Sequence, residues 1–286
     1  MKKLILLIVF SCFISTAGFC IKNSFRTLNM VFVPASEKSD AGEFKSLIDI
    51  VSKLTNLKID FIKVTDYNAA VEAMRAGRAD IAWFGATTYI IAAEIANADA
   101  FAAGIPKGQE DAGYYTYFVV KNDSPITRLA DARGKILALN SIGSTSGDYI
   151  PQVELLKNNL DIKNRTHFRN VFYAGSHDAS LMSVVYGQAD ICGMSSHNYK
   201  GRIADGTISK DAVRIVHTSA KVPPAPLAYS KKLPLEIRQA IKKAVLEAHK
   251  HGSIGGWGGE MEKYMSVEDA DFDIMREVRK IVESKR

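Results

Sequence analysis

Apolar residues along this chain recur in two rhythms that predict short strands separated by amphipathic helices. Apolar runs at residues 28–34, 57–64 and 80–84 have the length and the branched or aromatic content of strands. Helical spacing of apolar positions appears between them, at residues 43–54 and 66–76. Strands that alternate with helices at this spacing predict an α/β fold, with a mostly parallel sheet covered by helices on both faces.

An internal repeat indicates two similar lobes. Residues 73–82 run through the end of a helix, a glycine and an Ala-Asp-Ile strand start, and residues 183–192 repeat that order. Each copy ends in a loop of small and hydroxyl-bearing residues, at 85–88 and 193–196. Such helix-to-strand turns recur in α/β proteins generally. The shared loop chemistry nevertheless favours two related lobes.

Two extended segments connect the predicted lobes. Residues 114–120 are a β-prone run, and residues 221–229 contain prolines that exclude a helix. Open α/β sheets bind ligands beyond the carboxyl ends of their strands, so the sequence predicts a two-lobed clamshell with two crossing strands as its hinge. The predicted parts are residues 26–120 (first lobe), 121–221 (second lobe) and 222–286 (return to the first lobe, with helices at 234–250 and 267–284 around a glycine-rich turn at 252–259).

The start of the chain has the three regions of a secretory signal peptide. Lysines at 2–3 precede an apolar run at residues 4–14, and small residues follow at 15–18. The apolar run is too short to span a bilayer as a helix. We therefore predict a signal peptide over residues 1–20, cleaved on export to the periplasm or another extracytoplasmic space; a buried N-terminal helix is the alternative. Cys20 follows a phenylalanine instead of a small residue, which argues against a lipid anchor.

Composition and charge narrow the class of protein. The chain has 286 residues, 47% of them hydrophobic and 24% charged, which is typical of globular proteins. Its formal charge of +6 is mild, and the basic residues are not interleaved with aromatic ones, so no nucleic-acid partner is predicted. The cysteines and histidines follow no ligand spacing, so no metal and no cofactor are predicted. Cys192 lies in an apolar run and indicates a small buried side chain, with no structural disulfide implied.

A hydroxyl-rich loop, Ser144, Thr145 and Ser146, lies where an anion is favoured. Residues 135–139 predict a buried strand and residues 149–156 a helix, so the loop joins a strand end to a helix start. The first helical turn has unpaired N–H groups and a positive dipole end, and the hydroxyls add further donors. The alternative is that Ser144 or Ser146 only caps the helix.

Several short motifs follow one another along the chain, at residues 65–67, 77–85, 113–115, 129–135, 143–147, 176–178 and 187–190. Their order and spacing resemble the periplasmic solute-binding proteins of the phosphate, phosphite and phosphonate ABC importers. The resemblance extends from Val31 to about Lys250 and implies a type II-like periplasmic-binding-protein clamshell. It further implies a binding protein without catalytic residues, a small phosphorus oxyanion as ligand and a membrane permease as partner.

The same resemblance implies roles for individual residues. Ser144, Thr145 and Ser146 would hold the oxyanion, and His177 would add a donor from the same lobe. The remaining ligand-binding candidates belong to the loop after the third strand, the cleft wall and the loop after the second repeat; they are Phe84 and Thr87, Tyr67 and Tyr115, and Ser196 and His197. The simpler alternatives are that Tyr67 packs only on its helix, that the Tyr115 region is ordinary strand and that His177 caps a helix.

Other functions remain open at this stage. The stretch 143–147 approaches the Gly-x-Ser-x-Gly elbow of hydrolases, but Thr145 occupies the nucleophile position. His177 and Asp178 are adjacent in sequence, which is not how a base and its orienting acid are usually presented. We therefore predict no enzyme. The input domain of a signalling receptor, and a different oxyanion such as sulfate, a sulfonate or nitrate, are further alternatives.

The loop after the second repeat bears on ligand choice. Residues 194–199 carry no acid to face the ammonium of 2-aminoethylphosphonate, and a protonated His197 would repel that ammonium. We therefore expect phosphate, phosphite or a small alkylphosphonate to be preferred, unless Asp178, Glu43 or Glu94 reaches the cleft. Asp148 would disfavour an anion if it pointed inward.

Overall fold

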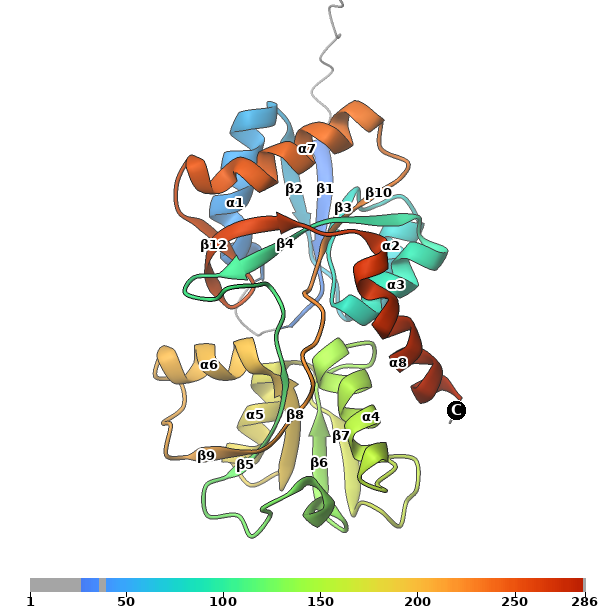
Figure 1. The fold of residues 1–286 in the computed structure, drawn as a ribbon, viewed down its shortest axis with the longest axis vertical. Helices are drawn as coiled ribbons and strands as arrows, with labels where there is room; N and C mark the ends of the chain where they lie inside the picture. The colour runs from blue at the N-terminus through green and yellow to red at the C-terminus, as the bar shows by residue number, and fades with distance from the viewer. Residues whose placement is uncertain (1–26, 36–39, 285–286) are drawn as a thin grey trace, which may run out of the picture.

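The computed structural model describes residues 27–35 and 40–284, and its elements form two lobes stacked end to end (Figure 1). The predicted signal peptide at residues 1–20 lies outside the described residues. Within the described ranges, no helix is both long enough and apolar enough to cross a membrane. The two-lobed α/β fold predicted from the sequence is confirmed.

The first lobe, drawn at the top of Figure 1, is a seven-stranded sheet with helices on both sides. Its helices are α1 (Asp40–Thr55), α2 (Tyr67–Arg75), α3 (Ala86–Ile95), α7 (Leu235–Glu247) and α8 (Asp273–Glu283). Its strands, in sheet order, are β11 (Ile254–Gly256), β12 (Gly259–Ser266), β4 (Ala98–Pro106), β10 (Leu227–Ser230), β3 (Ile81–Trp83), β1 (Thr27–Phe32) and β2 (Lys58–Ile62).

The second lobe is a smaller, five-stranded sheet. Its strands, in sheet order, are β7 (Asn170–Tyr173), β6 (Ile136–Leu139), β8 (Ile191–Ser195), β5 (Thr116–Lys121) and β9 (Val213–Thr218). Its helices are α4 (Ile150–Lys157), α5 (His177–Val185) and α6 (Ser196–Ala204), and a short π-helix, η2 (Thr145–Tyr149), precedes α4. Cys192 is fully buried in β8, as its apolar neighbours predicted.

Both sheets are mixed, whereas the sequence predicted mostly parallel ones. Strand β1 pairs in parallel with β2 and β3, and β6 pairs in parallel with β7 and β8; the other strand pairs are antiparallel. The parallel pairs come from strands joined by helices, which is the part that periodicity reveals. The antiparallel pairs involve strands that lie next to the crossings between lobes or follow α7, and among them β5, β10 and β12 run opposite to the parallel strands of their sheet.

Three stretches differ from the sequence prediction. The stretch 98–106 is strand β4, although its many alanines and a glycine give no strand-like alternation. The glycine-rich turn contains β11, and β12 extends to Ser266, so helix α8 begins at Asp273 instead of 267. Here small side chains are needed for close packing: a Cβ on Gly104 would lie 2.7 Å from Met261 Sδ. Tertiary packing therefore overrides low intrinsic strand propensity.

Two chain segments cross between the lobes, one from β4 to β5 and one from β9 to β10 (Figure 1). They pair with each other where Tyr114 N–H donates to the Val222 carbonyl at 3.2 Å and Val222 N–H donates to the Tyr114 carbonyl at 2.7 Å. Strand β5 belongs to the five-stranded sheet, so the predicted limit at residue 120 falls within it. The other lobe limits stay a prediction.

Helix α8 belongs to the first lobe but lies beside the second (Figure 1). Its buried face carries Met275, Val278 and Val282, which share an apolar cluster with Tyr149 and Ile150 of the second lobe. This cluster packs apolar side chains of both lobes together, so part of the first lobe's core extends across the interface. Burial of such a face contributes about 25 cal/mol for each Å² removed from water.

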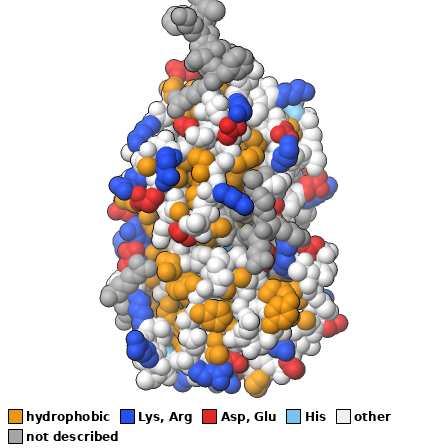
Figure 2. All heavy atoms as spheres, turned by 180° about the vertical axis from the view of Figure 1, so that it is seen from behind, with side chains coloured by type: hydrophobic (Ala, Val, Ile, Leu, Met, Phe, Trp, Pro, Cys, Tyr) orange, Lys and Arg blue, Asp and Glu red, His pale blue; other side chains and the backbone are white. Residues whose placement is uncertain are grey.

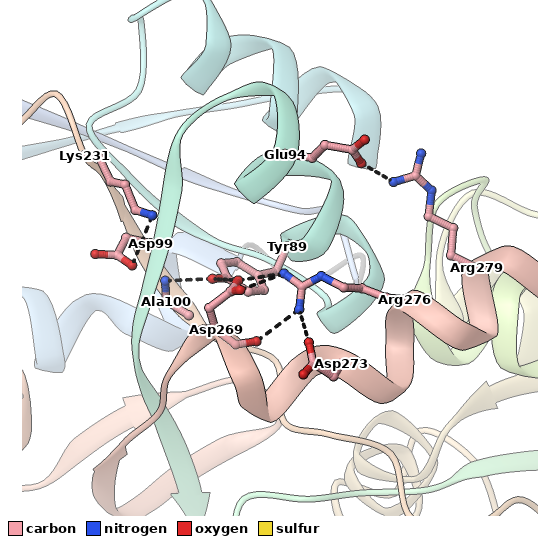
Figure 3. Close-up of polar contacts among 9 residues, drawn as sticks. All are labelled: Tyr89, Glu94, Asp99, Ala100, Lys231, Asp269, Asp273, Arg276 and Arg279. Atoms are coloured by element: carbon pink, nitrogen blue, oxygen red, sulfur yellow. Dashed lines mark hydrogen bonds and ion pairs between the residues drawn. The ribbon is translucent and has the colours of Figure 1, made fainter.

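Ion pairs fasten α8 to the rest of its lobe (Figure 3). Arg279 reaches Glu94 of α3 at 2.6 Å, and Arg276 binds both carboxylate oxygens of Asp269 at 2.8 Å. The Tyr89 hydroxyl donates to Asp269 at 2.7 Å. Partly exposed pairs of this kind contribute roughly 0–1 kcal/mol each. Glu94, one of the acids that the sequence analysis allowed to reach the cleft, is therefore paired with Arg279 of α8.

Candidate functional site

The hydroxyl loop begins with a tight turn that Ser144 stabilises. Ser144 Oγ accepts hydrogen bonds from Gly147 N–H at 3.2 Å and from Asn140 Nδ2 at 3.1 Å. Ser144 therefore caps the helical turn, and it also lines the cavity between the lobes. A Cβ on Gly147 would lie 2.2 Å from Asn140 Cβ, so only glycine fits there. The helical turns begin at Thr145 as a π-helix, earlier than the sequence predicted.

Asp148 stabilises the hydroxyl loop through hydrogen bonds and does not line the cavity. One carboxylate oxygen accepts from Gly143 N–H at 2.9 Å, and the other accepts from Gln152 Nε2 at 2.6 Å and from the Tyr173 hydroxyl at 2.8 Å. The residue is fully buried, and it is not among those that line the cavity between the lobes. Asp148 therefore organises the loop through three donors, and the sequence-based concern that it would face an anion is not supported by its position.

Thr145 joins the two lobes. Its Oγ1 accepts from the Thr87 N–H of α3 at 2.9 Å, and the Thr88 hydroxyl donates to the Gly143 carbonyl at 3.0 Å. A Cβ on Gly85 would lie 3.0 Å from Thr145 Oγ1, so a glycine allows this close approach. Both threonines of α3 are fully buried. The lobes are thus closed on each other at the hydroxyl loop.

His177 presents one defined nitrogen to the cleft. Its Nδ1 accepts from Ser195 N–H at 3.2 Å, so the proton of the neutral ring is on Nε2, which lies 3.5 Å from Ser146 Oγ. Burial lowers the pKa of His177 to about 3, which keeps the ring neutral. Its own backbone N–H donates to the Ala35 carbonyl of the first lobe at 3.2 Å. His177 therefore supplies a neutral N–H donor beside the serine.

Tyr114, which the sequence reasoning did not select, completes the donor set. Its phenol shares the cavity lining with Ser146 and Thr145, whose hydroxyls act on its pKa, and burial raises that pKa to about 12, so it keeps its proton at neutral pH. The predicted residue was Tyr115, whose side chain is absent from the lining of the cavity. Successive strand residues face opposite sides, so an error of one position moved the prediction to the wrong face.

These groups surround a narrow cavity of about 10 Å³ between the lobes. That is room for about one water molecule, so a larger ligand enters only when the lobes separate. No described lining residue carries a charge at neutral pH. Besides the hydroxyl loop, His177 and Tyr114, the lining residues are Val33, Ala35, Tyr67, Trp83, Gly85, Ala225 and Trp257.

The other candidates from the sequence have different places. Tyr67 lines the cavity, whereas Phe84 is fully buried without lining it, and its N–H donates to the Pro226 carbonyl at 3.0 Å. Ser196 Oγ accepts from Tyr115 N–H at 3.1 Å, away from the cavity. His197 lines a neighbouring cavity instead. The Phe84 side chain is thus packed in the interior, and the Ser196 hydroxyl is paired with a backbone N–H. Thr87 contacts Thr145 through its backbone N–H.

Trp83 and Trp257 are lining residues that the sequence reasoning missed. Trp257 comes from the loop between β11 and β12, inside the stretch predicted as a glycine-rich turn. The two indoles are 5.3 Å apart between ring centroids. A simple glycine-rich turn does not need a large apolar side chain. The tryptophan within this run of glycines was therefore the sequence signal that the stretch packs against the rest of the protein.

The geometry does not assemble a hydrolase site. His177 Nδ1 accepts from a backbone N–H, whereas Asp178 lies 3.5 Å from Arg202. Among the described residues, the partners of the His177 ring are a backbone N–H and the Ser146 hydroxyl, so no acid orients it as a base. In the described part of the chain, no group of three histidine, cysteine or acidic residues is placed to hold a metal ion. Figure 2 shows basic and acidic side chains interspersed over the rear face of both lobes.

Stability should depend on pH because two histidines are buried in neutral form. Burial lowers the pKa of His177 to about 3 and that of His197 to about 4, from 6.5. Below pH 6.5 the unfolded chain binds more protons than the folded protein. The free energy of unfolding should therefore be highest above pH 6.5. As the pH decreases below 6.5, it should fall by up to about 1.4 kcal/mol per pH unit for each histidine. Urea unfolding at pH 7.5, 6.5 and 5.5 measures this.

The variant His197→Phe tests the contribution of one histidine. It removes one of the two protons by which the unfolded chain exceeds the folded protein at low pH. Its loss of stability between pH 6.5 and 5.5 should be about half that of the parent protein. His249 is exposed, so His249→Phe should leave the parent slope unchanged. A parent profile that is flat between pH 7.5 and 5.5 would contradict the neutral burial of both rings.

A two-lobed binding protein is the class that this fold and this buried, donor-lined cavity define. The sequence matches the family of ABC transporter, phosphonate, periplasmic substrate-binding proteins over residues 30–272, and the chain belongs to that family. This confirms the resemblance seen in the sequence. It is a family of solute-binding proteins, not of enzymes.

Named relatives agree with this placement. The chain is 29% identical to the phosphate-import protein PhnD of Mycolicibacterium smegmatis over 172 residues, which are 57% of this chain and 53% of that protein. It is 25% identical to the phosphonates-binding periplasmic protein of Escherichia coli K12 over 203 residues, 69% of this chain and 59% of that protein. The matched stretches thus span little more than half the length of these relatives.

A solved structure shows the same fold. PhnD1 of Prochlorococcus marinus MIT 9301, in complex with methylphosphonate, superposes with a TM-score of 0.77 at 18% identity. The superposition covers 90% of this chain and 98% of that one. At this identity the likeness concerns the fold.

Proposed function

We propose that this protein is the extracytoplasmic substrate-binding component of an ABC importer and captures a small phosphorus oxyanion between its lobes. One observation carries the proposal: hydroxyls of Thr145, Ser146 and Tyr114 and the Nε2–H of neutral His177 converge on one buried cavity. Convergent donors without a nucleophile–base pair suit binding without reaction. The family, and the relatives named for phosphate import and phosphonate binding, support the choice of ligand.

The site would hold its anion by neutral donors alone. The hydroxyl loop lies at the start of η2 and α4, where the first helical turns present backbone N–H groups and a positive dipole end. Lysine and arginine are absent from the described lining, so the negative charge would be balanced by hydrogen bonds and dipoles. Such a site recognises tetrahedral oxygens by geometry, which favours a small ligand of fixed shape.

Closure of the lobes would bring the donors together. Thr145, Ser146 and His177 belong to the second lobe, whereas Tyr67, which also lines the cavity, belongs to the first. The two crossing segments would absorb the rotation, and the closed lobes would then present the ligand to a membrane permease. Export would follow cleavage of the signal peptide proposed for residues 1–20.

A zwitterionic ligand fits this site poorly. The described residues that line either cavity include no carboxylate. Asp178 lies 3.5 Å from Arg202, and the half-buried Glu43 accepts from Gly258 N–H at 3.3 Å outside the lining. Since burial keeps His197 neutral, repulsion by a protonated ring does not contribute, contrary to the sequence-based argument. The cost of an unpaired buried ammonium alone disfavours 2-aminoethylphosphonate.

A thermal-shift panel tests this proposal. Phosphate, phosphite and methylphosphonate should each raise Tm, because a ligand at 100 times its Kd stabilises a protein by about 2.7 kcal/mol. The shift with 2-aminoethylphosphonate at the same concentration should be smaller. Stabilisation by sulfate alone would overturn the phosphorus assignment, and a largest shift with 2-aminoethylphosphonate would overturn the argument from the missing carboxylate.

A further inference from the structure

A second small cavity adjoins the oxyanion cavity. The two share Trp83, Ala225 and Trp257 in their linings, so they lie against the same side chains. The second cavity measures about 20 Å³, room for about one water-sized group. Its remaining lining residues are mainly apolar: Phe44, Gly104, Ala112, His197, Met261 and Tyr264. We call it the substituent cavity.

Unsatisfied polar atoms lie in the lining of this cavity. His197 Nδ1 and Nε2 and Trp257 Nε1 are buried and have no hydrogen-bond partner among the residues that the structure describes. Both side chains are only 8% exposed. A buried donor or acceptor without a partner costs about 1–3 kcal/mol. Three such atoms on two neighbouring rings therefore leave a hydrogen-bonding capacity that a ligand group can use.

The chemistry of these atoms is defined by the packing around them. His197 lies with its ring centroid 5.3 Å from Tyr114 and 4.9 Å from Trp257. Burial lowers the pKa of His197 to about 4, so at neutral pH the ring has one N–H donor and one lone pair. The indole of Trp257 is a donor only. Together the two rings offer two donors and one acceptor.

We propose that the substituent cavity binds the organic group of a phosphonate, and that this group is small, uncharged and ends in a hydroxyl. The inference rests on the proposed function, because the oxyanion cavity must hold the phosphonate end. A hydroxyl both donates and accepts, so it pairs with the imidazole lone pair and with an N–H of Trp257 or His197. Phe44 and Met261 provide apolar contact for one methylene group.

Other end groups match the cavity less well. An ammonium only donates, so it leaves the indole N–H unpaired and adds a buried charge without a carboxylate. A carboxylate only accepts and would place a second negative charge beside the oxyanion. A methyl group fills the space but leaves all three polar atoms unsatisfied. A hydroxymethyl group is the smallest carbon substituent that both donates and accepts a hydrogen bond; its methylene meets the apolar lining and its hydroxyl is the one water-sized group that the cavity holds.

Calorimetry with an isosteric pair of ligands tests the proposal on the unmodified protein. Hydroxymethylphosphonate and ethylphosphonate differ by a hydroxyl in place of a methyl group, with nearly the same size. The hydroxyl compound should bind about tenfold or more tightly, because a site built to hydrogen-bond a hydroxyl rejects an analogue without one. Equal affinities, or tighter binding of ethylphosphonate, would overturn the inference.

Two variants locate the preference. In Trp257→Phe and in His197→Phe the ratio of the two affinities should fall toward one, while binding of ethylphosphonate persists, because each variant keeps an apolar aromatic ring and loses only hydrogen-bonding groups that ethylphosphonate does not use. The exposed His249→Phe variant should keep the parent ratio. A parent preference that both cavity variants retain would show that the hydroxyl binds elsewhere and would overturn the inference.

The same titrations distinguish failure of the substituent inference from failure of the proposed function. If phosphate, methylphosphonate and both isosteric ligands all bind but the pair does not differ, the importer proposal stands and only the substituent inference fails. If none of the four binds, the proposed function fails and the inference fails with it.

Discussion

Replacing Thr145 with alanine is expected to weaken binding of the phosphorus oxyanion about tenfold or more. The Thr145 hydroxyl lines the cavity, and its oxygen accepts from the Thr87 N–H at 2.9 Å, so its proton is left to turn from the Tyr114 phenol to the ligand. A hydrogen bond to a charged group contributes roughly 1.5–3 kcal/mol. The substitution also leaves the Thr87 N–H without its partner. Titration calorimetry with phosphate and methylphosphonate measures the loss.

Two matched variants separate the hydroxyl from other effects of the substitution. Thr145→Ser keeps the hydroxyl and should bind almost as tightly as the parent protein. Thr207 is exposed on the second lobe, so Thr207→Ala should leave the affinity unchanged. If Thr145→Ala binds both ligands as tightly as the parent, the hydroxyl loop only caps the helix and carries no affinity.

We expect Thr145 also to couple ligand binding to lobe closure. The same oxygen that lines the cavity receives a backbone donor from the opposite lobe, while Tyr114, beside it, belongs to a crossing segment. A ligand that orders this hydroxyl therefore stabilises the closed arrangement as well as its own contacts. Release of the ligand requires these contacts between the lobes to break, so we expect the loss in Thr145→Ala to appear mainly as faster dissociation.

Local patterns were sufficient to predict the centre of this site. A strand end, three hydroxyl residues and a helix start occur consecutively in the sequence, so Ser144, Thr145 and Ser146 follow from neighbouring residues alone. His177 follows a glycine at another strand end of the same lobe, and both meet because the carboxyl ends of parallel strands β6 and β7 lie side by side. The position of these residues at one cavity could thus be predicted locally, while their role in binding stays a prediction.

The rest of the site depends on contacts that periodicity does not contain. Tyr114 and Tyr115 are equally aromatic, and only the strand register decides which one is buried. Trp257 reaches the cavity because β11 and β12 return along the edge of a sheet that begins more than 200 residues earlier in the chain. Such long-range pairing gives no signal in neighbouring residues, which is why β4, β11 and β12 were missed.

Removing the carboxylate of Asp148 is expected to cause the largest loss of stability. Asp148→Ala leaves Gly143 N–H and Gln152 Nε2 without an acceptor in the interior, whereas the partly exposed Tyr173 can turn to water. Each orphaned buried donor costs roughly 1–3 kcal/mol, so the free energy of unfolding should fall by about 2–4 kcal/mol. Urea denaturation at pH 7.5 without ligand measures this change.

The asparagine variant distinguishes the lost acceptor from the lost charge. In Asp148→Asn the amide oxygen can still accept from Gly143 N–H, while Gln152 can turn its own amide to match, so the loss should be clearly smaller than in Asp148→Ala. Asp123 is exposed, and Asp123→Ala should stay within about 0.5 kcal/mol of the parent. If Asp148→Ala is as stable as the parent, water replaces the carboxylate behind the loop; if Asp148→Asn is equally damaged, the negative charge itself holds the loop in place.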